Sequence, residues 1–255
     1  MDKIYINLSM KISPQHLTSK LYNKRNENIK GEYTMAQFRT VSVVCPSCNK
    51  KEDIRLWEEI NAEQDITAKN KILNGEMFQY RCKKCGYTTY TAHNCIYKDP
   101  KKNLMIYLAA DGDVEGMSNA MDNVSKNAKV MAPIVISSIR RIVLNTNSFR
   151  EKILIFDNNL DDRMIELLKQ MYVLSLSEDY PELQIRECYF CIVDNKWKLE
   201  LITDDGRMFS VNMDKSIYDE FEEKYRKIVD EIGNCYVVDE GYAMSVFDKF
   251  ITDNQ

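Results

Sequence analysis

The chain is poor in the residues on which many catalytic and secretory designs depend. Only two of its 255 residues are histidine, which leaves little material for histidine-based catalysis. Only eight residues are glycine and five are proline, so collagen-like and low-complexity chains are excluded. No apolar run approaches the roughly 20 residues of a membrane helix, and the N-terminus lacks the apolar core of a secretory signal. We therefore expect a soluble, cytoplasmic protein without a membrane partner.

Charge is distributed unevenly along the chain. The net charge is +3 over residues 1–34, +3 over 35–112 and −10 over 113–255, and the last step falls at a turn-type Asp-Gly-Asp sequence. This pattern predicts two modules behind a polar N-terminal segment. We expect a segment over residues 1–35, a ribbon domain over 36–112 and an acidic α+β domain over 113–255.

Two interpretations of the N-terminal segment stay open. It is rich in Asn and Lys and has no sustained apolar period, as in a disordered arm. Alternatively, Lys30-Gly31-Glu32 can be encoded by a purine-rich bacterial ribosome-binding sequence, which would make the segment a translated leader and Met35 the natural start.

Eight cysteines are present, and four of them form two Cys-x-x-Cys pairs, Cys45/Cys48 and Cys82/Cys85. In a reducing compartment such pairs indicate a metal before a disulfide, and four thiolates at this spacing are typical of tetrahedral Zn²⁺. The 33 residues between the pairs exceed the spacing of an ordinary ribbon, so an additional element must lie between them. We expect one structural Zn²⁺ per chain.

The remaining cysteines give weaker signals. Cys188 and Cys191 have the same spacing but lie in a strand-like segment, where positions i and i+3 point to opposite faces. We interpret them as buried strand residues, with a metal site as the alternative. Cys95 and His93 follow the second pair in another strand-like segment, and we expect them to be ordinary residues of a hairpin.

The pattern of elements predicts an α+β fold class. Residues 38–45 alternate as a strand into the first pair, and Asn61–Leu73 lacks strand alternation and is followed by Gly75, a helix stop. Residues 78–82 are strand-like, and two further strands around residues 87–109 form a hairpin. This combination is an expanded zinc-ribbon β module with an inserted helical segment.

The acidic half predicts helices and an antiparallel meander. We expect a helix around residues 114–129, a capping box at Ser148–Glu151, and a helix after Asp161 with an apolar stripe. Three consecutive short strands follow, joined by turns at Asp194-Asn195 and at residues 203–206. Asp214 then caps a helix that Gly233 ends.

Several of these residues together resemble the CpXC family of bacterial proteins. The resemblance rests on Cys45-Pro46-Ser47-Cys48, Asn61, Ile72–Gly75, Cys82/Cys85-Gly86, Tyr97-Lys98-Asp99, Met105-Ile106-Tyr107, Glu151–Asp157, Leu160–Asp162 and Ile165–Lys169. It covers the chain from about residue 40 to at least 170. The resemblance implies metal binding and a bacterial cytoplasmic setting, and it supplies no reaction.

Three function classes are compatible with these features. No phosphate-binding or nucleophile-elbow motif occurs, and an enzyme would have to use carboxylates such as Asp161, Asp162 and Glu166 with a divalent cation. A nucleic-acid-binding regulator would use the cations and aromatics near the cysteine pairs, which are Lys50, Lys51, Arg55, Arg81, Lys83, Lys84, Tyr80, Tyr87 and Tyr90. We favour a protein-interaction or adaptor module whose partner is another protein or a second copy.

Overall fold

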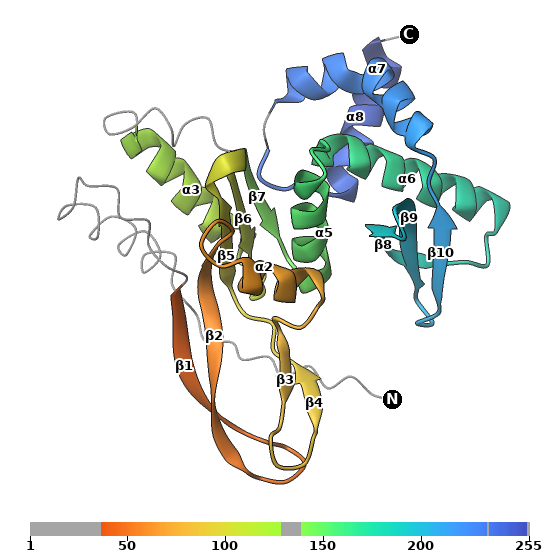
Figure 1. The fold of residues 1–255 in the computed structure, drawn as a ribbon. Helices are drawn as coiled ribbons and strands as arrows, with labels where there is room; N and C mark the ends of the chain where they lie inside the picture. Colours follow the sequence, from red (N-terminus) through yellow and green to blue (C-terminus); the bar gives the residue numbers. More distant parts are fainter. Residues whose placement is uncertain (1–36, 129–138, 234, 254–255) are drawn as a thin grey trace. The chain divides into compact units, whose positions relative to one another are not determined.

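The structure of the chain, a computed structural model, describes residues 37–128, 139–233 and 235–253. It divides into two compact units, residues 1–150 and 151–255, and its helices and mixed sheets make it an α+β protein (Figure 1). The expected segment 1–35 lies outside the described residues. No helix within the described ranges is long and apolar enough to cross a membrane.

A mixed five-stranded sheet forms the first unit. Its order is β1-β2-β5-β6-β7, with antiparallel β1/β2 and β5/β6 pairs and parallel β2/β5 and β6/β7 pairs. Parallel neighbours require a crossover, and helix α3 supplies the one between β6 and β7. The strands are β1 Gln37–Val44, β2 Lys51–Asn61, β5 Cys95–Asp99, β6 Leu104–Leu108 and β7 Ile139–Val143, and α3 is Val114–Ala128.

The additional element between the cysteine pairs consists of β2 and helix α2, Ile66–Leu73. Asp65 caps α2, because its side chain accepts a hydrogen bond from the backbone N–H of Ala68 at 3.2 Å. Gly75, with a φ of 75°, follows the helix end as expected. The helical insertion is thus confirmed, and it leads to a separate antiparallel pair, β3 Gln79–Arg81 and β4 Thr88–Tyr90.

Aromatic contacts join this insertion to the main sheet of the first unit. Phe149, fully buried in helix α5 (Thr146–Asp157), lies edge-to-face against Phe78 at 6.1 Å and Tyr97 at 6.4 Å between ring centroids. A short 3₁₀ turn, η2 Pro100–Lys102, closes the β5–β6 hairpin, and Asn103 takes up its left-handed position at φ 48°.

In the second unit, helices pack with an antiparallel meander. The three strands β8 Ile185–Val193, β9 Lys196–Thr203 and β10 Met208–Asn212 pair in the order β10-β9-β8, which confirms the expected meander. Asp194 and Asn195, at φ 52° and 60°, form the turn between β8 and β9. The helices are α6 Asp162–Asp179, α7 Lys215–Ile232 and α8 Glu240–Asp253.

One sequence expectation differs from the structure at helix α5, Thr146–Asp157. The capping box is wrong, because the side chain of Asn145 caps this helix by accepting the N–H of Ser148 at 2.8 Å. Glu151 is instead buried in an ion network described below. The compact units meet between Arg150 and Glu151, so the charge step near residue 112 lies inside the first unit, where β7 extends the sheet.

A network of buried charges links α5 and α6 within the second unit. Lys152 Nζ lies 2.9 Å from a carboxylate oxygen of Asp162 and 3.9 Å from one of Glu166. Lys169 Nζ lies 2.9 Å from Glu166 and 3.1 Å from Glu151. Removing one member of such a buried set leaves an uncompensated charge in a medium of low polarity, which is far more costly than losing an exposed pair.

We expect Lys152→Met to lower the free energy of unfolding of the second unit by about 3–5 kcal/mol, because Asp162 loses its buried counter-charge. The matched control is Lys249→Met, since Lys249 forms ion pairs with the exposed carboxylates of Glu231 and Asp253. That control should cost less than about 1 kcal/mol. Urea unfolding followed by circular dichroism measures both, and equal midpoints would contradict the assignment.

Candidate metal centre at two cysteine knuckles

Each cysteine pair forms the turn of an antiparallel strand pair, and the two turns have the same backbone pattern. In the first turn, the N–H of Cys45 donates to Lys50 O at 2.9 Å and the N–H of Asn49 donates to Cys45 O at 2.9 Å. In the second, Cys82 N–H donates to Tyr87 O at 2.8 Å and Gly86 N–H to Cys82 O at 3.0 Å. We call these turns the first and second knuckle.

The residue after the second cysteine of each pair has a left-handed backbone conformation. Asn49 has a φ of 54° and Gly86 a φ of 75°. Asn tolerates this region better than most side chains, and Gly adopts it without a Cβ clash. These two positions let each knuckle curl so that both of its cysteines face the same point.

The structure brings the four predicted ligands together. The Sγ atoms of Cys45, Cys48, Cys82 and Cys85 all lie within 4.8 Å of one another, and the Cys45–Cys85 and Cys48–Cys82 distances are both 3.6 Å. A disulfide would require about 2.05 Å. Four sulfurs placed tetrahedrally at about 2.3 Å from one ion are separated by about 3.8 Å. The arrangement therefore fits a single metal ion, and a zinc-ribbon-like module is compatible with it.

Backbone hydrogen bonds prepare the sulfurs to carry negative charge. The N–H of Tyr87 donates to Cys85, and this bond together with the neighbouring thiols lowers the pKa of Cys85 to about 6. The N–H of Lys50 acts in the same sense on Cys48, but burial and the three other thiols outweigh it and raise the pKa of Cys48 to about 12. Cys85 is thus the more acidic of these two thiols, and a bound cation would favour the thiolate of Cys48 as well.

A glutamate braces the second knuckle, and the sequence analysis did not identify it. Glu52, on β2, accepts a hydrogen bond from the hydroxyl of buried Tyr80 at 2.7 Å and a longer one from the N–H of Lys83 at 3.4 Å. The bond from Tyr80 lowers the pKa of Glu52. The sequence held one signal for this role of Glu52: an acidic residue at a position that faces inward in an alternating strand.

The weaker cysteine and histidine candidates lie outside the cluster. Cys191 is buried and Cys188 half-buried in β8, as expected for strand residues, and burial raises the pKa of Cys188 to about 12. Buried His93 places its ring nitrogens 2.9 Å from Thr91 O and 3.0 Å from Trp57 O. These contacts, and the burial of Cys95, agree with the interpretation of both as structural residues.

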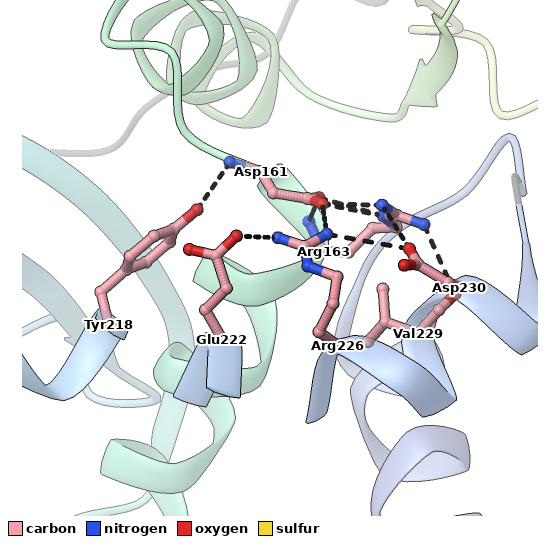
Figure 2. A network of polar contacts seen from close by, with 7 residues as sticks. All are labelled: Asp161, Arg163, Tyr218, Glu222, Arg226, Val229 and Asp230. Carbon is pink, nitrogen blue, oxygen red and sulfur yellow. Dashed lines mark hydrogen bonds and ion pairs between the residues drawn. The ribbon is translucent and has the colours of Figure 1, made fainter. Parts of the chain in front are cut away.

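Asp161 is engaged by two arginines rather than open to a cation (Figure 2). It caps α6 by accepting the N–H of Arg163 at 3.0 Å. The guanidinium groups of Arg163 and Arg226 each lie 2.7 Å from the same carboxylate oxygen. The N–H of Asp161 also donates to the hydroxyl of Tyr218 at 3.0 Å. Burial of the carboxylate would raise the pKa of Asp161, but the hydrogen bonds from Arg163 and Arg226 outweigh burial and hold the pKa below its ordinary value.

Asp162 and Glu166 share a helix face, and that face is buried rather than turned to solvent. Both are buried, and both lie against Lys152. The four-cysteine set is the only group of metal-ligating side chains found in the described part of the chain. The sequence signal for this network was a set of lysines and acids spaced at helical intervals among apolar residues of α5 and α6.

The cations considered for nucleic-acid binding are all exposed. None of them forms an ion pair with a carboxylate of the described residues. They are Lys50, Lys51, Arg55, Arg81, Lys83 and Lys84. The aromatic set is smaller than expected, because Tyr80 is buried and bonded to Glu52, which leaves half-buried Tyr87 and exposed Tyr90.

Comparison with known proteins agrees with the site. No curated protein and no solved structure matches the chain significantly. A family model described as CpXC protein matches residues 43–169, which include both knuckles, the insertion between them and the first half of α6. On this match, and with its four-cysteine cluster in place, the chain belongs to the CpXC family.

Proposed function

We propose that the four cysteines hold one Zn²⁺ ion as a structural staple and that the stapled ribbon serves as a protein-interaction module. The observation that supports the metal is the sulfur cluster itself, with its 3.6 Å contacts and all four atoms within 4.8 Å. Four sulfur ligands suit Zn²⁺ or iron and complete a tetrahedral shell. A complete shell has no open position for an activated water, which favours a structural role.

The packing around the cluster explains why a metal would be needed. The small core at the knuckles contains only three buried residues, Cys45, Tyr80 and Cys82, so two of its three members are ligands. The β3–β4 pair has only three residues in each strand, and a strand pair of that size with so little apolar burial is marginally stable on its own. Metal binding to four thiolates contributes about 10–16 kcal/mol, which is ample to hold the two pairs together.

Two features support the interaction role: the closed metal shell and the pairing of the buried carboxylates. The shell is closed, and the carboxylates that an enzyme would have to use are bonded to lysines and arginines. A rigid ribbon with exposed strands suits recognition of another polypeptide. We place such a protein in the cytoplasm, where thiols stay reduced and available to metal.

A second candidate is nucleic-acid binding at the knuckles, favoured by the six exposed cations that form no ion pair with another described residue. Zinc bound by four thiolates would leave a residual negative charge beside them and reduce their effect on phosphates. Retention on single-stranded nucleic acid that decreases steeply with salt would support this candidate. Salt-insensitive association with a protein would support the interaction module.

We expect one zinc ion per chain, and a Cys85→Ser variant that loses both the ion and the β1–β4 ribbon structure. The reason is that a hydroxyl is a poor substitute for a thiolate in a shell of four sulfurs. Native mass spectrometry gives the metal stoichiometry, and the identity follows from elemental analysis.

The matched control for this variant is Cys191→Ser. It changes a buried cysteine that belongs to another Cys-x-x-Cys sequence, in β8. Its zinc content should equal that of the parent chain. Full zinc occupancy in Cys85→Ser, or iron in the parent, would contradict the proposal.

Glu52→Ala should release zinc to a competing chelator about 10–100-fold faster, because residues that orient metal ligands contribute on that scale to metal retention. Glu52→Gln keeps a carbonyl oxygen that can accept from Tyr80 and from the N–H of Lys83, so its release rate should stay close to that of the parent. Stopped-flow mixing with a chromogenic chelator measures the rates. Equal rates for the Ala and Gln variants would show that Glu52 does not brace the site.

A further inference from the structure

Strand β1 lies at one edge of the five-stranded sheet and is paired on one side only, with β2 (Figure 1). Among the described residues no strand lies beyond it. None of its eight residues is buried, whereas at the opposite edge four of the five residues of β7 are buried. The outer side of β1 is therefore the open edge of this sheet within the described chain.

The devices that normally protect an open edge are few in β1. Such edges are guarded by lysines, prolines or short length. The sequence of β1 is QFRTVSVV, with no proline and one charged residue, Arg39. Arg39 lies 3.4 Å from Glu58 of the neighbouring strand, so its charge is already compensated. Phe38 and Val44 are 44% and 58% exposed, which places two large apolar side chains on the solvent face of the strand.

The alternation of β1 restricts how another strand can add to it. Even-numbered residues are exposed on the outer face and odd-numbered residues are half-buried on the inner face. An antiparallel partner strand of the same sequence must place outer residues opposite outer residues, because a one-residue shift exchanges the faces. A two-fold axis at Val41 achieves this over almost the whole strand.

In this register the side chains are matched. Phe38 lies opposite Val44 of the second copy at both ends of the strand pair, and Thr40 lies opposite Ser42 of the second copy near its centre. Aromatic–β-branched and hydroxyl–hydroxyl pairs are favourable cross-strand neighbours. Moving the axis to Thr40 would place Phe38 opposite Ser42 and lose the apolar match.

We propose that β1 pairs antiparallel with β1 of a second copy of this chain, with the two-fold axis at Val41, which joins the two sheets into one. The proposal rests on the proposed interaction module and names its partner. Because Val44 is followed directly by Cys45, the first knuckle fixes the end of the pairing edge, and zinc would stabilise that edge. A single strand pair is small for an interface, so the dimer should form reversibly with rising concentration.

Cysteine cross-linking tests the register in the full-length chain. Thr40→Cys and Ser42→Cys are prepared separately, both at exposed positions of β1. Directly opposite Cβ atoms lie about 4.5–5.5 Å apart, within reach of a disulfide after small adjustments, whereas diagonal neighbours lie about 7–8 Å apart. The mixture of the two variants should therefore give disulfide-linked dimers with diamide, and each variant alone should give no more than the parent chain.

Sedimentation of the parent chain and its zinc content are measured on the same preparation. A chain that binds zinc but stays monomeric at the highest attainable concentration overturns the pairing and leaves the metal proposal standing. Disulfide-linked dimers that form as efficiently in either variant alone as in the mixture overturn the register. A chain without zinc that still cross-links only in the mixture supports the pairing and contradicts the proposed staple.

Discussion

The first unit depends on the meeting of four sulfur atoms that come from two distant turns. The knuckles are separated by a long strand and a helix, and each is the end of its own antiparallel pair. Beside the cluster, a small apolar patch and the contacts of Glu52 with Tyr80 and with the N–H of Lys83 hold the two pairs against each other. The cluster therefore joins the turn of the β1–β2 pair to the turn of the β3–β4 pair, the two strand pairs labelled in Figure 1.

The backbone, as well as the sulfur atoms, shapes the cysteine cluster. The paired N–H groups, the left-handed residues after the second cysteines and the donated hydrogen bonds on Cys48 and Cys85 recur in both knuckles. Such preparation reduces the reorganisation that a metal would otherwise have to drive. The two turns have the same backbone pattern, although their sequences share little beyond the cysteines.

The four clustered cysteines and most strands could be predicted from the sequence because their signals are local. A Cys-x-x-Cys turn, an alternating run and an Asp-Asn turn each report on a few neighbouring residues. The contact of Glu52 with the second knuckle and the helix cap by Asn145 were not predicted. Each depends on which of several polar groups forms a given hydrogen bond, and a local sequence pattern does not decide that. The burial of Asp162 and Glu166 was not predicted for the same reason: their partner, Lys152, lies on a different helix.

The end of the matched family segment falls inside helix α6, at residue 169, although the helix continues to Asp179. Ile165, Leu167 and Leu168 are fully buried there, in the same core as residues of β8, β9, α7 and α8. A chain that carried the family segment and nothing after it would present this apolar helix face to water. Relatives that share residues up to this point therefore need a C-terminal cover of their own, and the sequence of that cover is free to differ as long as it is apolar on one side.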